Sequence, residues 1–298
     1  MKKFIIILCG LLCLTGCNKK DTMEDITIYT TVHPLEVVVN RLYGKYSKIN
    51  SIYPNGVNIR TNPCTTCLDD LYTLTEKQLS DYSHADLFIF NSLLYEGNYV
   101  QTMSNNNKNL KIINGTDNLN RDEFFGLEEL WLDPSRLLTI ARNIKNGFNE
   151  YIDNYYLKQD VENNFNLLKE DLDKLGAKLA TMTKNAPNKN IVVSNDVFKF
   201  LGKNKFGLTV YSLENNENLS DKTISDVKTL IENKQIKYIY VKQYEEVSSL
   251  INELIKDTDI KIVPIHMLTN LTENEKSNKK DYFTIMNENI ELIRKGLY

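Results

Sequence analysis

The fold is decided by the stretch KQDVENNFNLLKEDLDKLGAKLATMTKNA, residues 158–186 of a chain of 298 residues. Its apolar side chains recur at alternate spacings of four and three, the period of one helix face; they are Val161, Phe165, Leu168, Leu172, Leu175, Leu179 and Met182. This stripe covers about 22 residues, or roughly 33 Å of helix, and Pro187 follows it. A coiled-coil strand would show a similar stripe, but three heptads are close to the minimum for one. We therefore predict one long helix that spans a domain.

Short β-branched and aromatic strands alternate with amphipathic helices on both sides of this helix. The predicted strands are 26–32, 49–53, 85–91, 110–113, 190–194, 208–211, 236–241 and 260–264. The predicted helices are 35–42, 76–82, 133–148, 198–201, 224–231, 245–255 and 282–297. Such alternation is typical of a parallel sheet with helices on both faces. We predict an α/β fold of two lobes, residues 26–157 and 187–298, joined by one long rigid helix, 158–186, with ligand bound in a cleft between the lobes.

The first 17 residues have the features of an export signal. Two lysines precede an apolar run, residues 4–14, which is too short to span a bilayer. The run ends in Leu14-Thr15-Gly16-Cys17, which is typical of a lipobox. We predict a signal peptide at 1–17, a lipid such as palmitate on Cys17, and a polar tether at 18–25 that holds the protein at the outer face of a membrane. The alternative is a plain signal peptide with a chance cysteine.

Charge and motifs argue against two broad functional classes. The formal net charge is −3, and no basic patch has the density of nucleic-acid binders, so we expect no nucleic-acid partner. The chain has no nucleophile elbow, phosphate-binding loop or zinc-protease motif. We therefore expect a monomeric binding protein rather than an enzyme, without a catalytic cofactor.

Six segments carry a resemblance to a known family. They are YTTVHPL at 29–35, YPNG at 53–56, ADL at 85–87, WLDP at 131–134, SNDVFKFL at 194–201 and YFTIMNENI at 282–290. In this order and spacing they resemble the solute-binding lipoproteins of zinc and manganese ABC importers. The resemblance implies two lobes bridged by a rigid helix, a transported zinc or manganese ion between them, and an ABC permease and ATPase as partners.

The chain departs from that family at the expected metal ligands. The resemblance implies histidines at two positions that are Glu129 and Asn195 here. It also implies an imidazole on a loop where this chain has Arg60 or Asp70, and a fourth, often acidic, ligand near Asn270. Two or three expected imidazoles are therefore replaced.

A Cys-x-x-Cys pair offers a different metal site at the same loop. Two thiolates at this spacing can reach one ion, and a set that mixes sulfur with oxygen suits zinc better than manganese. The predicted ligands are Cys64, Cys67, Asp70, Glu129, Asn195 and His266. The alternatives for the cysteines are a surface disulfide, which export permits, or no role.

The remaining histidines are weaker candidates. His33 follows the first predicted strand, where it is either a ligand or a side chain that caps or hydrogen-bonds the next helix. His84 precedes a strand and is expected at the surface.

The sequence as a whole predicts a membrane-anchored extracytoplasmic solute-binding protein of an ABC importer, with a metal ion or another small ligand as cargo. The alternative is a divergent lipoprotein of the same fold that no longer binds metal. Such a protein would act in adhesion, in regulation or in binding another solute.

Overall fold

A computed structural model describes residues 23–57, 59, 72–94, 96–202 and 204–298. Four residues with predicted roles lie outside the described residues: Cys17, Cys64, Cys67 and Asp70. None of the described helices combines the length and apolar character that crossing a bilayer requires.

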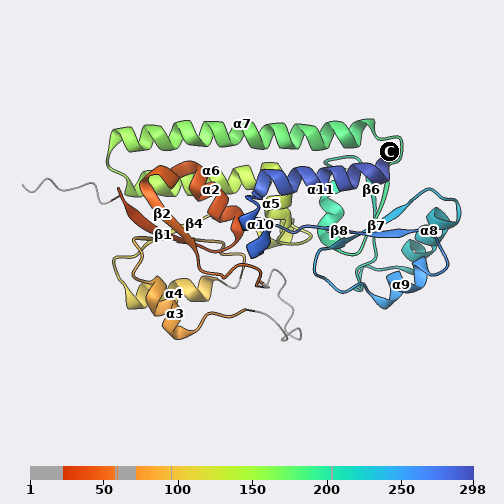
Figure 1. Cartoon of the computed structure of the whole chain (residues 1–298), viewed down its shortest axis with the longest axis horizontal. Coiled ribbons are helices and arrows are strands. Elements are labelled where there is room, and N and C mark those ends of the chain that lie inside the picture. Colours follow the sequence, from red (N-terminus) through yellow and green to blue (C-terminus); the bar gives the residue numbers. More distant parts are fainter. Residues whose placement is uncertain (1–22, 58, 60–71, 95, 203) are drawn as a thin grey trace, which may run out of the picture.

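Two four-stranded parallel sheets form the two lobes, which confirms the predicted fold class (Figure 1). The N-terminal sheet has the order β2-β1-β3-β4, with β1 (Ile26–Thr30), β2 (Ser47–Ser51), β3 (Leu87–Phe90) and β4 (Lys111–Asn114). The C-terminal sheet has the equivalent order β6-β5-β7-β8, with β5 (Asn190–Val193), β6 (Thr209–Ser212), β7 (Tyr238–Lys242) and β8 (Lys261–Ile265). All eight predicted strands are present, and their ends differ from the prediction by at most two residues.

The helices of the N-terminal lobe are α2 (His33–Tyr43), α3 (Glu76–Tyr82), α4 (Gly97–Asn106), α5 (Glu129–Leu132) and α6 (Pro134–Tyr151). The Asp133 side chain accepts a hydrogen bond from the Ser135 backbone N–H (3.0 Å) at the start of α6, as the sequence predicts. Helix α4 has no counterpart in the prediction. It buries only Tyr99 and Met103, so its sequence shows no apolar period.

The helices of the C-terminal lobe are α8 (Asp221–Glu232), α9 (Ser249–Ile255), α10 (Glu273–Ser277), α11 (Tyr282–Leu297) and the 3-10 helix η4 (Asp196–Leu201). The predicted helix at 245–255 is too long at its start. Helix α9 begins at Ser249 because the Ser248 side chain accepts from the Ile251 N–H and caps it there. Helix α10 was not predicted, although Thr272 and Glu275 form a capping box at its start.

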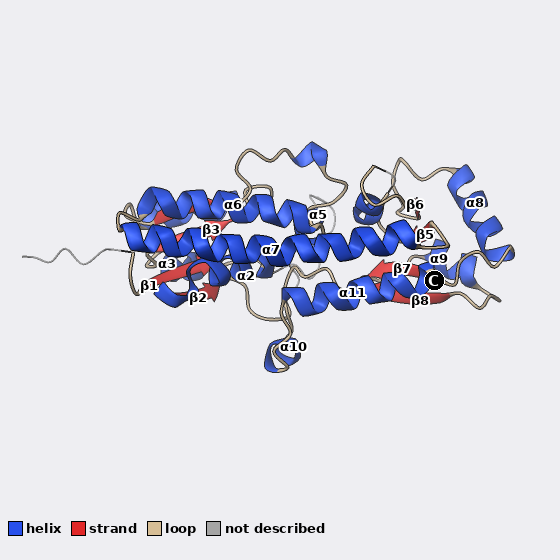
Figure 2. Cartoon of the chain, turned by 90° about the horizontal axis from the view of Figure 1, so that it is seen from above, coloured by secondary structure: helices blue, strands red, loops and turns tan. Residues whose placement is uncertain are grey.

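Helix α7 (Tyr155–Asn185) is the predicted long helix, and it contains 31 residues. Every residue of its apolar stripe is buried. The helix packs on α2 and α6 of the N-terminal lobe and on α11 of the C-terminal lobe, so it runs along both lobes (Figures 1 and 2). It begins three residues earlier than predicted because the Asn154 side chain accepts from the Tyr156 N–H (2.8 Å) and caps it.

Candidate metal site between the lobes

The carboxyl ends of the two sheets face each other where the lobes meet. Strand β1 leads into α2, and the His33 backbone N–H donates to the carbonyl of Thr269 after β8 (3.0 Å). Strand β7 ends at Lys242, whose ammonium group donates to Glu128 Oε1 just before α5 (2.8 Å). Open α/β folds bind their ligands at such edges. The lobe boundary is therefore the candidate site.

Trp131 joins α5 to the segment that follows β8. Its fully buried indole Nε1–H donates to the Met267 carbonyl (2.7 Å). The Tyr282 hydroxyl, at the start of α11, donates to the Trp131 carbonyl (2.7 Å). Both bonds connect residues of opposite lobes, so they hold the loops of the candidate site in register.

A second set of contacts closes the boundary at Asn270, near which the resemblance places a ligand. Its amide group donates to the carbonyls of Pro54 (2.7 Å) and Val57 (3.2 Å). The Gly56 N–H donates to the Leu271 carbonyl (2.9 Å), and the positive φ of Gly56 (+76°) suits glycine. Asn270 thus serves here to dock the lobes.

Ion pairs between described residues cross the boundary, and one of them joins Lys276 to Glu36 (3.9 Å). The Lys242–Glu128 pair is largely out of water, with side-chain exposures of 10% and 3%. The Lys205 ammonium contacts the carboxylate of Asp133, which is buried at the start of α6. Each buried charge needs such a partner because water does not solvate it. The boundary is therefore a packed polar interface.

Glu129 is buried on the N-terminal side of this interface. Its Oε2 accepts from the Phe125 N–H (3.2 Å), and its Oε1 lies 3.6 Å from Arg136 Nη2. Burial raises the pKa of the Glu129 carboxyl, and Arg136 opposes that rise. Metal binding at Glu129 would compete with both contacts.

Asn195 lies in the C-terminal lobe, two residues after the end of β5. Its side-chain oxygen accepts from the Val197 N–H (3.0 Å) and caps η4. The amide oxygen that a metal would use is therefore engaged in helix capping.

His266 has the hydrogen bonds of a structural histidine. Its Nδ1 accepts from the Leu268 N–H (2.8 Å), so the proton of the neutral ring is assigned to Nε2. The Nε2 atom lies 3.2 Å from Glu275 Oε1, but it is not aligned for a hydrogen bond. Burial lowers the pKa of His266, which agrees with a neutral ring. Zinc could bind Nε2 only if the bond to Leu268 broke and the proton moved.

His33 has the opposite arrangement, on the other side of the boundary. Its Nδ1 lies 3.4 Å from Glu36 Oε2 and can donate its proton there. Its Nε2 is buried and has no hydrogen-bond partner among the described residues. Metal-binding histidines commonly donate one ring N–H to a carboxylate and offer the other nitrogen to the ion. His33 therefore meets the requirement of a ligand better than His266 does.

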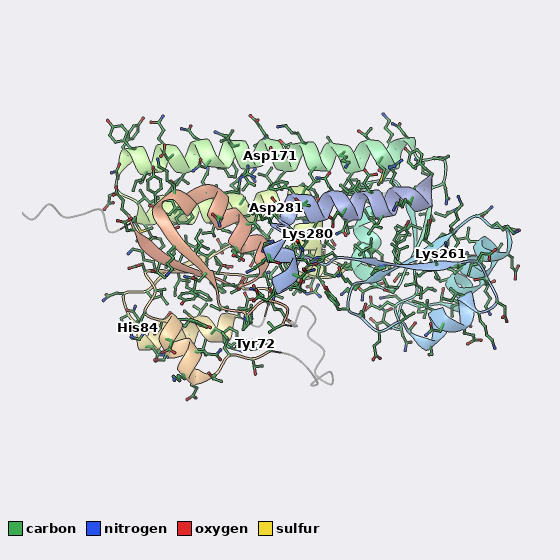
Figure 3. The ribbon with its side chains drawn as sticks, viewed as in Figure 1. Tyr72, His84, Asp171, Lys261, Lys280 and Asp281 are labelled. Carbon is green, nitrogen blue, oxygen red and sulfur yellow. The ribbon has the colours of Figure 1, made fainter. Side chains whose placement is uncertain are left out.

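The structure describes three of the predicted ligands, and no side-chain hydrogen bond or ion pair links them to one another. These three are Glu129, Asn195 and His266. Among the described residues, no group of three or more His, Cys, Asp or Glu side chains could hold a metal ion. His84 is exposed, as expected, and Figure 3 shows it at the outer side of the N-terminal lobe, away from Lys280 and Asp281 near the boundary.

A cavity beside the boundary is lined by apolar side chains and by one polar residue, Asn289, and so does not suit an ion. It lies between α5, α7, η4, β8 and α11, and its lining includes Leu132, Leu179, Phe198, Ile265 and Ile290.

A buried carboxyl group lies at the edge of the N-terminal sheet. Glu96 Oε2 accepts from the Asn91 N–H after β3 (3.1 Å), and the side chain is almost entirely buried. Burial raises the pKa of Glu96 to about 8. The folded state therefore binds a proton that the unfolded chain, with a pKa near 4.5, releases.

We expect the contribution of Glu96 to the stability of the protein to fall as the pH rises from 5 to 8. Because the folded pKa of Glu96 is the higher one, its contribution is fully present below pH 4.5 and is lost as the pH approaches 8. The loss should be roughly 3 kcal/mol over this range. Urea unfolding at several pH values measures it, and Glu96→Gln should flatten the profile. An unchanged slope in that variant would contradict the assignment.

One family profile matches residues 28–296, which is nearly the whole chain. The family is described as ZnuA, zinc-uptake complex component A, periplasmic. The chain belongs to the ZnuA family. This membership confirms the resemblance found in the sequence, and the ZnuA family consists of metal-binding uptake components rather than enzymes.

Relatives of the ZnuA-family chain differ in length. The zinc-binding protein AdcA of Streptococcus pyogenes is 27% identical over 169 residues, which are 55% of this chain and 32% of AdcA. The chain thus covers about a third of the length of that relative. The high-affinity zinc uptake system protein ZnuA of Bacillus subtilis is 22% identical over 330 residues, which are 99% of this chain and 96% of that protein.

A solved structure of the same fold supports the architecture. The Zn(II)-bound ZnuA-like domain of Streptococcus pneumoniae AdcA has a TM-score of 0.69 at 21% identity. The superposition covers 92% of this chain and 99% of that one. The two-lobed α/β fold of this ZnuA-family member is thereby confirmed.

His33 could have been paired with Glu36 from the sequence alone. Its spacing of three residues from Glu36 on a helix is a visible signal, because such side chains are neighbours. The Lys242–Glu128 pair gave no such signal, since 114 residues separate its members.

Proposed function

We propose that this chain is the zinc-binding component of an ABC importer and delivers zinc to a permease driven by an ATPase. The family match over residues 28–296 carries the proposal. The relatives named above are zinc proteins, which favours zinc over manganese as cargo. Family membership does not favour the alternative of a lipoprotein that has lost its metal.

The proposed anchor is lipid on Cys17, which would keep the protein at the outer face of the membrane. Two or more acyl chains give lasting attachment. A tethered binding protein stays close to its permease, so the anchor would serve uptake directly.

We place the zinc ion at the lobe boundary and include His33 among its ligands. The Nε2 of His33 is buried without a hydrogen-bond partner among the described residues, and it can offer a lone pair while Nδ1 donates to Glu36. The other ligands are proposed from the sequence-predicted set: Cys64, Cys67, Asp70, Glu129, Asn195 and His266. Thiolate and imidazole together suit zinc.

Zinc titration of the purified chain against a competing chelator tests this function. We expect one ion per chain at submicromolar affinity, and His33→Gln should weaken binding by about 100-fold because it removes a ligand nitrogen. The combined change Cys64→Ser and Cys67→Ser should weaken it similarly. His84→Gln is the matched control, because this histidine is exposed and far from the boundary (Figure 3).

The results of the titration test the proposed ligands and the proposed function separately. A folded chain that binds no zinc would overturn the proposed function. Tight binding that His33→Gln leaves intact would remove His33 from the ligand set but leave the function standing. A disulfide between Cys64 and Cys67, found by mass measurement without reductant, would remove both thiolates from the proposed ligand set.

A further inference from the structure

We propose that the end of the molecule where α7 begins rests on the lipid bilayer, with Tyr155 and Tyr156 at the level of the headgroups. The inference rests on the proposed lipid attachment at Cys17. It concerns the orientation of the tethered protein, which neither the fold nor the metal site determines.

The two tyrosines form an exposed aromatic pair. Their side chains are among the most exposed large apolar ones of the described residues, at 69% for Tyr155 and 77% for Tyr156. The rings pack edge to face with centroids 5.8 Å apart. Neither hydroxyl hydrogen-bonds another described residue. A pair of rings that the fold leaves uncovered therefore lies at the first turn of α7.

The length of the tether limits how far this end can lie from the membrane. Met23, the first described residue, follows Cys17 by six positions. Six residues span at most about 22 Å when fully extended. Lipid on Cys17 would therefore keep the surface around Met23 within about 22 Å of the headgroups.

A short chain of contacts links Met23 to the start of α7. The Tyr43 hydroxyl donates to the Met23 carbonyl (2.6 Å), and the Tyr43 ring packs 5.4 Å from that of Tyr46. The Tyr46 hydroxyl binds the Asp160 carboxylate, which is about one helical turn from Tyr156. Figures 1 and 2 both show β1 and α7 beginning at the same end of the molecule.

The side chains at the end of the molecule where α7 begins suit a lipid interface without net charge. Tyrosine is enriched at membrane surfaces because its ring is apolar and its hydroxyl can stay hydrated. The nearby exposed charges are mixed, and they include Glu24, Lys45, Lys48, Glu150 and Asp153. A mixed set gives no strong attraction to anionic lipids. The proposed partner is therefore a zwitterionic headgroup layer.

Hydroxyl-radical footprinting of the lipidated full chain in phosphatidylcholine liposomes tests the proposal. Mass spectrometry gives the oxidation of each tyrosine, compared with a Cys17→Ser chain free in solution. We expect oxidation of Tyr155 and Tyr156 to fall by about threefold or more on liposomes, because lipid excludes the radical. Tyr244, which is 71% exposed in the C-terminal lobe, should stay unchanged and serves as the internal control.

Variants test whether the pair itself makes the contact. The combined change Tyr155→Ser and Tyr156→Ser should remove the liposome protection of the neighbouring, partly exposed Tyr46. Tyr244→Ser should leave that protection intact.

Three results would overturn the proposal in distinguishable ways. Equal oxidation with and without liposomes would show that this end does not touch lipid, while zinc uptake as a function would stand. Protection that grows with protein concentration without liposomes would show that a second copy covers the tyrosines. A Cys17 without lipid would overturn both this inference and the proposed anchor.

Discussion

Replacing Trp131 with alanine should lower the free energy of unfolding by about 3–5 kcal/mol, because it leaves a large cavity where the lobes meet. The side chain is fully buried, and its indole donates the hydrogen bond to Met267 that joins α5 to the segment after β8. The Met267 carbonyl would lose this partner in the variant. Urea unfolding followed by circular dichroism measures the change, because Trp131 is the only tryptophan and fluorescence would vanish with it.

Trp131→Phe is the matched control for the packing part of this effect. It keeps an aromatic ring but removes the N–H, so we expect a smaller loss of about 2 kcal/mol. If Trp131→Ala cost less than about 1 kcal/mol, the lobes would not depend on this contact for their stability.

Replacing Lys242 with methionine should cost about 3–5 kcal/mol of stability, because it removes the ammonium group that contacts the buried carboxylate of Glu128. The pair crosses the lobe boundary at 2.8 Å, with little exposure of either side chain. The cost should appear in thermal and urea unfolding near neutral pH.

The double variant Lys242→Met and Glu128→Gln separates the stability lost through the buried charge from the stability lost through packing. Since it removes both charges, most of the lost stability should return. If the double variant is as unstable as Lys242→Met, the buried charge is not the cause. An exposed pair such as Lys222–Asp226 offers the control, because removing its lysine should cost less than about 1 kcal/mol.

The elements that the sequence predicted well are those whose pattern is local. The stripe of α7 repeats over many turns, and each of its apolar residues is buried as predicted. The eight strands were visible because β-branched runs stand between turns. Helix α4 was missed because it buries two side chains, which is too few to produce a period.

The candidate site was harder to predict because its chemistry depends on partners that are distant in the sequence. His266 and His33 look equally suited to a metal as residue types. Nδ1 of His266 accepts from the Leu268 N–H, so its proton is on Nε2. Nδ1 of His33 can donate to Glu36, which leaves its Nε2 without a hydrogen-bond partner among the described residues. Glu129 was predicted as a ligand, yet the Phe125 N–H and Arg136 engage its carboxylate.

The sequence by itself determined the α/β class, the long helix α7 and the membership of the ZnuA family. Periodicity and motif order can be recognised in a sequence without knowing the tertiary contacts. Only the tertiary structure decided which polar groups at the lobe boundary are already satisfied. Hydrogen bonds such as those of His266 and Asn270 form between segments that the fold alone brings together. A residue type shows what a side chain can bind, but its free lone pairs depend on the neighbours that the fold supplies.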